Sequence, residues 1–265
     1  MTPITSPQNS RVKDAVRLRD RRHRRKQGRI IIDGARELLR AIASGVEPVE
    51  TFVCPALCHS AESKNLLEML PRPGGEVFEV GEAVFDKLSF GDRAEGVLAV
   101  AAAPQKTLDS LMPAENALIA VLEAVEKPGN LGAVLRSADA AGLSALIAAD
   151  PRTDLYNPNA IRASLGTIFT MPVREATGGE TLAWLRRYGF RIVAARVDGS
   201  VPYTEADYRG RTAVVLGSEA EGLSALWRGG DIRAVRLPML GAADSLNVSA
   251  AAAVLFYEAL RQRSA

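Results

Sequence analysis

The stretch EKPGNLGAVLRSADAAGLSALI, residues 126–147, decides how the second half of this 265-residue chain is interpreted. An apolar run ends in a Pro-Gly turn, and apolar residues then recur at helical spacing, at Leu131, Val134, Leu135 and Ala138. A second apolar run closes the stretch. This order predicts a strand, a turn and a helix that packs on a sheet. The glycines lack the G-x-G-x-x-G spacing of a dinucleotide-binding turn, which argues against a Rossmann-type enzyme.

Three residues of this stretch are candidates for a site. Asn130 follows the Pro-Gly turn and is placed to cap the helix. Gly132 and Arg136 are four residues apart, so the guanidinium leans back over a glycine that costs about 1 kcal/mol of helix propensity. An arginine near a helix N-terminus favours a nearby anion. The alternative is that Arg136 pairs with Asp139 or another acid, while Gly132 permits close helix packing.

Strands and helices are expected to alternate from residue 117 onward. The expected strands are uninterrupted apolar runs, which are typical of a parallel sheet covered on both faces; they lie at 118–122, 145–148, 190–195, 213–216 and 232–237. The helices expected between and after them lie at 131–141, about 157–166, 179–188, 221–227 and 245–262.

A second motif, VVLGSEAEGLS (214–224), directly follows one of these buried strands. A glycine turn at the carboxyl end of a parallel strand is where open α/β sheets place ligands, and Gly217 lies at such a turn. Glu219 offers a carboxylate there. The alternative is an ordinary strand–helix connection in which Ser218 caps the helix.

A third motif, RLPMLGAADSLNVSAAAAVLFYEALRQR (236–263), predicts a strand end, a Gly/Ala loop and a long helix. Ser245 or Asn247 can cap that helix. The alanines at 250–253 permit a very close approach of another backbone, or belong to an ordinary alanine-rich core helix.

The first part of the chain predicts a smaller α/β domain, residues 1–102, joined by a linker at 103–116 to a domain at 117–265. The linker contains two prolines and polar residues. Strands are expected at 29–33, 49–54, 76–80 and 96–102, with helices at 34–45, 60–70 and 81–88 and a closing turn at PRPGG, 71–75.

Charge is distributed unevenly along the chain. Residues 1–40 have a net charge of +8, against −6 for the remainder, and arginine outnumbers lysine 27 to 6. Arginine grips phosphate oxygens with a planar fork, so this segment favours a polyanion such as RNA, although a solvated amphipathic helix is the alternative. The candidate RNA contacts are Arg21, Arg22, Arg24, Arg25 and Arg29.

Composition restricts the other classes of function. The longest apolar run has eight residues, short of the roughly 18 that span a bilayer, and no signal peptide is recognisable. A cytoplasmic protein with no membrane partner is therefore expected. Cys54, Cys58 and His59 share one loop but lack a fourth ligand and zinc-finger spacing, so no metal is expected.

Taken in order, the three motifs resemble those of the SPOUT superfamily of RNA methyltransferases, SpoU/TrmH branch. They match as N-x-G-x-x-x-R from Asn130 to Arg136, as G-S-E-x-E-G-L from Gly217, and as L-P-M followed by S-L-N-V from Leu237. The segment TDLYNPNAIRASLGTIF (153–169) resembles the one that this branch carries between the first two motifs. Residues 1–102 resemble, more loosely, the ribosomal-protein-like substrate-binding domain of such enzymes.

The resemblance implies an α/β fold in which a C-terminal parallel-sheet domain contains a deep trefoil knot and a small α/β RNA-binding domain precedes it. It implies a homodimer with active sites at the subunit interface. It also implies S-adenosylmethionine as cofactor, and transfer of its methyl group to a ribose 2′-hydroxyl of ribosomal or transfer RNA. The residues implied to contact the cofactor are Ala195, Gly217, Leu237 and Leu246.

The implied catalytic set is Asn130, Arg136, Glu219, Ser245 and Asn247. Arg136 would contact the target phosphate and hydroxyl, either as a base or, more easily for a group of pKa above about 12, as an electrostatic activator. Glu219 would fix Asn130 or Arg136. Lys127 departs from the branch, which often has an acid before the proline. A ribose or base acceptor, and a non-catalytic RNA-binding protein, stay open as alternatives.

Overall fold

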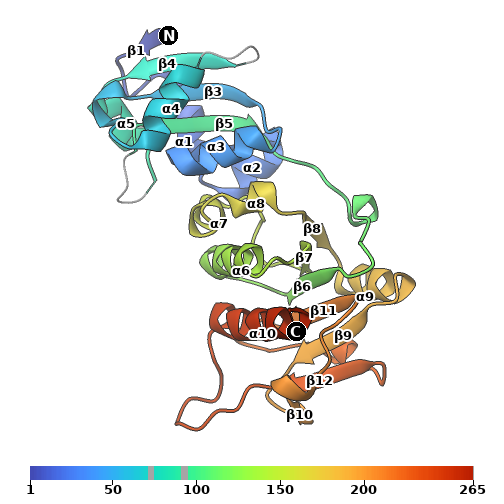
Figure 1. Cartoon of the computed structure of the whole chain (residues 1–265). Helices are drawn as coiled ribbons and strands as arrows, with labels where there is room; N and C mark the ends of the chain where they lie inside the picture. The colour runs from blue at the N-terminus through green and yellow to red at the C-terminus, as the bar shows by residue number, and fades with distance from the viewer. Residues whose placement is uncertain (71–74, 91–94, 265) are drawn as a thin grey trace. The chain divides into compact units, whose positions relative to one another are not determined.

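A computed structural model describes residues 1–70, 75–90 and 95–264 of the chain, so most of the turn expected at 71–75 lies outside the described residues. The chain forms two compact units (Figure 1). Unit 1 comprises Met1–Gln105 together with Tyr156–Thr170. Unit 2 comprises Lys106–Leu155 together with Met171–Ala265.

Unit 1 is built on a five-stranded mixed sheet in the order β1-β4-β3-β5-β2. Strand β3 pairs in parallel with β4 and antiparallel with β5, which also pairs antiparallel with β2. The strands are β1 Thr2–Ile4, β2 Arg29–Asp33, β3 Pro48–Val53, β4 Glu76–Val80 and β5 Val97–Ala102. The helices are α1 Ser10–Arg17, α2 Arg21–Gln27, α3 Ala35–Ala43, α4 Ala61–Met69 and α5 Glu82–Leu88, with a 3-10 turn η1 at Pro55–Leu57.

The basic N-terminal segment, residues 1–28, folds because it packs on the core of unit 1. In α1 the apolar residues Val12 and Ala15 are buried against the sheet, together with Leu18 beyond the helix end. All strands and helices expected between residues 29 and 102 are present. The N-terminal segment, whose positive charge favours a polyanion partner, forms strand β1 and the two short helices α1 and α2.

Residues 156–170 differ from the expected division of the chain, because they fold with unit 1. This segment contains α7 Pro158–Ala163 and α8 Thr167–Thr170, which contact β2 and α3 respectively. The Arg40 guanidinium donates a 2.7 Å hydrogen bond to the carbonyl of Leu165. At Gly166, a side chain would lie 2.9 Å from the Cα of Glu37, so the glycine allows this close approach to α3. The sequence predicts this segment to belong to the second domain, because it lies between strands of that domain.

Unit 2 is built on a seven-stranded, wholly parallel sheet in the order β10-β12-β9-β11-β6-β7-β8 (Figure 1). The five expected strands are confirmed, and two short ones join at the edges. The strands are β6 Leu118–Glu123, β7 Ala145–Ala149, β8 Val173–Ala176, β9 Arg191–Ala195, β10 Val201–Pro202, β11 Thr212–Leu216 and β12 Ile232–Arg236.

Helices cover the sheet of unit 2, as its apolar strands require. One face packs on α9 Gly178–Arg187, whose Leu182 and Leu185 share a core cluster with Trp227 and with alternate residues of β6, β7, β9 and β11. Helices α6 Pro128–Ala140 and α10 Val248–Arg263 pack against each other and contact β7 and β11. The connections contain the 3-10 turns η2 Leu108–Ser110, η3 Tyr203–Glu205 and η4 Ala225–Arg228.

The helix expected at 221–227 was wrong, since only the 3-10 turn η4 forms there. Gly222 has φ +68 and its N–H donates back to the carbonyl of Ser218, so the chain reverses tightly before any helix can start. Within the described residues, no helix is both long and apolar enough to cross a membrane.

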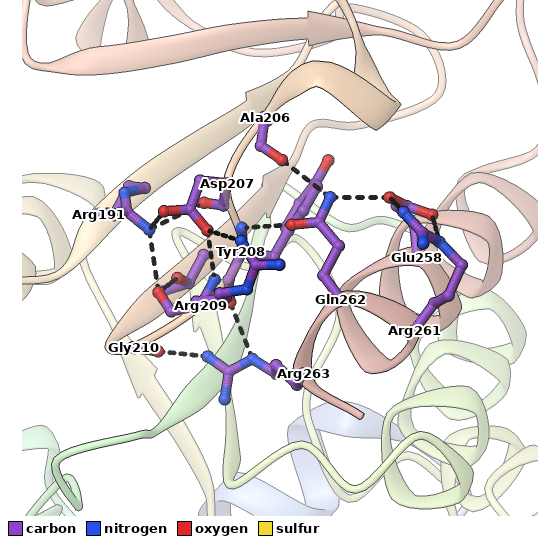
Figure 2. Close-up of polar contacts among 11 residues, drawn as sticks. Arg191, Ala206, Asp207, Tyr208, Arg209, Gly210, Glu258, Arg261, Gln262 and Arg263 are labelled. Atoms are coloured by element: carbon purple, nitrogen blue, oxygen red, sulfur yellow. Dashed lines mark hydrogen bonds and ion pairs between the residues drawn. The ribbon is translucent and has the colours of Figure 1, made fainter. Parts of the chain in front are cut away.

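The C-terminal end of α10 is tied to the segment 206–210 (Figure 2). The Gln262 amide accepts from the N–H of Tyr208 at 3.1 Å and donates to the carbonyl of Ala206 at 3.0 Å. Arg263 donates to the carbonyls of Tyr208 and Gly210. These bonds fix the helix whose opposite end contributes Asn247 to the site described below.

Candidate active site

Three residues implied to bind the cofactor lie at the carboxyl-terminal end of the sheet in unit 2. Ala195 is the last residue of β9, while Gly217 and Leu237 directly follow β11 and β12. Strand β9 lies between β11 and β12, and all three are parallel, so their carboxyl ends lie side by side at the same end of the sheet. Open parallel sheets bind ligands at that end.

The turn at Gly217 depends on the absence of a side chain. A Cβ at this position would collide with the backbone of Gly222 and Leu223. Ser218 and Gly222 form an isolated β-bridge, and the Ser218 hydroxyl accepts from the N–H of Glu221 at 3.1 Å. Ser218 therefore closes the turn instead of capping a helix.

A cavity of about 560 Å³, including its open mouth, lies beside this turn. Apolar side chains and a few polar groups line it: Leu122, Val125, Glu126, Lys127, Asn130, Gly217, Ser218, Glu219, Ala220 and Val248. Segments from the first two motifs and the start of α10 thus form one hollow.

Glu219 is the centre of the polar contacts at this cavity. Its Oε1 accepts from Asn130 Nδ2 at 2.7 Å and from Asn247 Nδ2 at 2.5 Å. Its Oε2 lies 2.8 Å from Lys127 Nζ. Hydrogen bonding to Lys127, ahead of that to Asn130 and to the N–H of Val248, lowers the pKa of Glu219. The three motifs therefore converge on one ionised carboxylate.

The role expected for Asn130 as a helix cap was wrong. Helix α6 begins at Pro128, which places Asn130 in the first turn, and Lys127 at the cap position makes no side-chain capping bond. Proline is favoured at the first helical position because the missing N–H has no helical partner there. The Asn130 amide is consequently available to Glu219 and to Asn247, whose Nδ2 lies 3.3 Å from Asn130 Oδ1.

Arg136 has an exposed side chain on α6. It follows Asn130 by six residues, which is about 9 Å along the helix axis. Among the described residues, no hydrogen bond or ion pair joins it to Asp139 or to any other side chain, so the pairing considered as an alternative does not occur. Gly132 is buried within α6, which packs on α10.

Ser245 and Leu246 lie in an exposed segment, 241–247, that precedes α10. Neither lines the cavity, and the same holds for Arg136, Ala195 and Leu237. Asn247 is the N-cap of α10 and accepts from the N–H of Ser249 at 2.9 Å. Of Ser245 and Asn247, the two residues expected as caps, Asn247 therefore caps the helix. The structure thus brings Asn130, Gly217, Glu219 and Asn247 together.

Two cations beside the cavity, Lys127 and Arg152, were not expected as site residues. Arg152 contacts the carboxylates of Glu126 and Glu221, the latter at 2.6 Å, and so links the first and second motifs. The sequence offers one signal for Lys127, which departs from the motif expected of the SpoU/TrmH branch. It offers none for Arg152, which lies outside the motifs and reaches two acids 26 and 69 residues away only through the folded loop.

The basic residues of unit 1 separate into two groups. Arg22 and Arg25 are exposed on α2, and Arg21 and Arg29 are half-buried. Arg24 is only 5% exposed and donates 2.7 Å bonds to the carbonyls of Leu18 and Arg19. This corrects the expectation for Arg24, whose guanidinium joins α1 to α2 and does not face solvent.

The two cysteines are buried, and burial raises the pKa of both thiols. Cys58 Sγ lies 3.3 Å from the carbonyl of Cys54. Among the described residues, no group of three or more His, Cys, Asp or Glu is arranged to hold a metal ion.

Comparison with known proteins defines the class of each unit. Residues 117–257 match the SpoU rRNA methylase family, and residues 9–99 match the MRM3-like substrate binding domain. A 23S rRNA (uridine(2479)-2′-O)-methyltransferase of Streptomyces viridochromogenes is 33% identical over 255 residues, covering 93% of this chain and 87% of that protein.

Solved structures agree with the sequence relatives. The crystal structure of an RNA 2′-O ribose methyltransferase shares 43% identity and a TM-score of 0.88, and the match covers 100% of both chains. The SpoU methyltransferase AviRb from Streptomyces viridochromogenes, solved with AdoMet, shares 28% identity and a TM-score of 0.87, over 97% of this chain and 99% of that one. The fold is that of an RNA methyltransferase with a smaller preceding domain. The chain belongs to the SpoU rRNA methylase family.

Proposed function

We propose that this protein is an S-adenosylmethionine-dependent RNA methyltransferase that modifies a ribose 2′-hydroxyl of ribosomal RNA. The observation that carries the proposal is the convergence of Asn130, Glu219 and Asn247 beside one cavity, in a chain of the SpoU family. Relatives with this family's domain are named as 23S rRNA 2′-O-methyltransferases, which supports the ribose acceptor and the class of RNA.

The residues present fit the proposed cofactor. Ala195, Gly217 and Leu237 lie at the carboxyl ends of three adjacent strands. A Cβ at Gly199 would lie 2.8 Å from the Arg236 backbone nitrogen, so backbone segments approach closely there. Ala195, Gly217, Leu237 and Leu246 are the proposed cofactor contacts. When bound, S-adenosylmethionine supplies an electrophilic methyl group on a positively charged sulfur.

The chain's own residues would bind and orient the RNA. Asn130 and Asn247 have amides fixed by Glu219, so they can hold the ribose in one orientation, with Ser245 contributing from the loop before α10. Arg136 has a guanidinium with no protein partner among the described residues, which leaves it available for the target phosphate and for the oxygen as negative charge develops there. An arginine gives up its proton with difficulty, so electrostatic activation is its proposed role.

Two features of the family complete the proposal. The protein would act as a homodimer, with each active site completed across the subunit interface, and α10 would thread through a deep trefoil knot. The small residues at 250–253 support such a crossing, because they permit a close approach of backbone segments. Unit 1 would deliver the RNA through exposed cations of α2, including Arg22 and Arg25.

The test is methyl transfer by the purified full-length protein from labelled S-adenosylmethionine to unmodified ribosomal RNA. Digestion and mass spectrometry of the product locate the methyl group on ribose or base. We expect a 2′-O-methyl nucleotide. Cofactor binding without transfer to any RNA would instead support a non-catalytic RNA-binding protein, and a methylated base would overturn the ribose assignment.

Replacement of Arg136 tests the assigned role directly. We expect Arg136→Ala to lower kcat/KM by at least about 100-fold, because a charged group acting on the transition state is lost. The cofactor Kd, measured by calorimetry, should change by less than about threefold. Arg187→Ala, which removes an exposed arginine from α9, is the matched control and should retain activity. A parallel loss of cofactor binding in Arg136→Ala would contradict the assignment.

A further inference from the structure

Lys127 stands at a position where a cation is locally unfavourable. It is the N-cap residue of α6, makes no side-chain capping bond, and has a side chain that is 70% exposed. The N-terminal end of a helix carries partial positive charge and favours acids, so a lysine there costs stability unless an anion compensates it. Residues that break a local rule in this way are typically retained for function.

The compensating anion is Glu219, the centre of the site. Lys127 Nζ lies 2.8 Å from Glu219 Oε2, on the opposite oxygen from the one that receives Asn130 and Asn247. Both asparagines contribute neutral amides, so Lys127 is the charged partner among these contacts. The pairing raises the pKa of Lys127 and lowers the pKa of Glu219, with the mutual hydrogen bond as the first cause of each shift.

Glu219 is the main partner of Lys127 among the neighbouring acids. Glu126 also raises the pKa of Lys127 through its charge, but less than Glu219 does. Arg152 engages the carboxylates of Glu126 and Glu221. The remaining groups facing Glu219 are the amides of Asn130 on α6 and Asn247 on α10, and the backbone N–H of Val248. The described contacts therefore form two separate sets, Arg152 with the outer acids and Lys127 with Glu219.

We propose that Lys127 is a positioning residue of the methyltransferase site, where its ammonium holds one oxygen of the Glu219 carboxylate. The other oxygen is thereby fixed in place to hold the amides of Asn130 and Asn247 in the orientation that receives the ribose. This inference rests on the proposed function, since the amides matter only if the cavity receives the substrate.

The test compares Lys127→Gln, which removes the charge, with Lys127→Arg, which keeps it. Lys106→Gln removes an equal charge from an exposed site in the same unit and serves as the control. For each full-length variant, kcat and the RNA KM are measured from pH 5.5 to 9, with cofactor affinity and thermal midpoint alongside. The Glu219 carboxyl titration is followed separately by NMR of protein labelled at glutamate, assigned with Glu219→Gln.

In Lys127→Gln we expect the Glu219 titration to move to higher pH by about half a unit to one unit. Across pH 5.5 to 9, kcat should fall by about tenfold, because the carboxylate that fixes the two amides loses its contact with Lys127 while it stays ionised. Lys127→Arg should stay within about threefold of the wild type, and Lys106→Gln should match it. The cofactor affinity and thermal midpoint should hardly change.

Two results would overturn the proposal. If the Glu219 titration in Lys127→Gln equals that of the wild type, Lys127 does not hold the Glu219 carboxylate. If only the RNA KM rises, with kcat and its pH profile unchanged, Lys127 is a simple phosphate contact. Failure of the proposed function is distinguishable, because it would show as absent transfer in the wild type while the NMR titration still reports on the ion pair.

Discussion

At the scale of single residues, the site depends on where polar side chains find partners. Asn130 has the residue type of a helix cap, yet its amide reaches Glu219, 89 positions later in the chain. Arg24 has the residue type of a phosphate contact, yet it is buried on the carbonyls of Leu18 and Arg19. Residue type therefore states which interactions are available, and the fold selects among them.

Asp33 at the end of β2 gives a prediction for the pH dependence of stability. Burial is the first cause that raises its pKa from 3.8 to about 6, and its Oδ2 accepts from the N–H of Phe90 at 2.6 Å. The folded protein thus holds this proton more tightly than the unfolded chain does. Stability from this group is present below about pH 4 and is lost as the pH rises to about 6.

Asp33→Asn should remove this dependence, because an amide stays neutral and can still accept from Phe90. Relative to the wild type, the variant should gain stability between pH 4 and pH 6.5, reaching on the order of 2 kcal/mol. Urea unfolding at a series of pH values measures the difference. Asp86→Asn, an exposed change of the same kind in unit 1, should show little of it. A constant difference across this range would contradict the prediction.

At the scale of elements, α10 connects the site to the far side of unit 2. Its first residues follow Asn247, the N-cap that donates to Glu219, while its last turn is fixed to the segment 206–210 (Figure 2). A 16-residue helix spans about 24 Å, so bonds at one end set the position of the other. The long apolar and alanine-rich pattern predicted the helix, but these partners come from chain more than 50 residues away.

Gln262→Leu tests the fastening of α10. The substitution leaves the N–H of Tyr208 and the carbonyl of Ala206 without their side-chain partner in a buried place, so unit 2 should lose about 2–4 kcal/mol of stability. Denaturant unfolding followed by the fluorescence of Trp184 and Trp227, both buried in unit 2, measures the loss. The exposed Arg261→Gln should change the unfolding midpoint much less. Equal effects of the two variants would contradict this account.

At the scale of the whole molecule, the two units divide the proposed tasks. Unit 2 holds the cavity and the polar contacts around Glu219, whereas unit 1 carries the exposed cations of α2. Phosphate contacts supply affinity and fix position without reading sequence. RNA binding and methyl transfer should therefore be separable by substitution.

The double substitution Arg22→Gln/Arg25→Gln should raise the RNA KM by about tenfold at moderate salt and reduce the salt slope of RNA binding by about two. The cofactor Kd should stay unchanged, because the substitutions lie in unit 1. Binding titrations at several salt concentrations and calorimetry measure both. Arg36→Gln/Lys64→Gln removes the same charge from α3 and α4 of unit 1, so an equal effect from that pair would assign RNA binding to net charge instead of α2.

The sequence by itself determined the strands and helices between residues 29 and 102 and the five longer strands of unit 2, since apolar runs and helical spacing depend on neighbouring residues. It also determined the family, through three motifs that the comparisons confirm. Tertiary structure alone decided that 156–170 fold with unit 1 and that Lys127 and Arg152 engage the carboxylates around the cavity. These outcomes depend on contacts between distant segments, whose distances and burial no local pattern encodes.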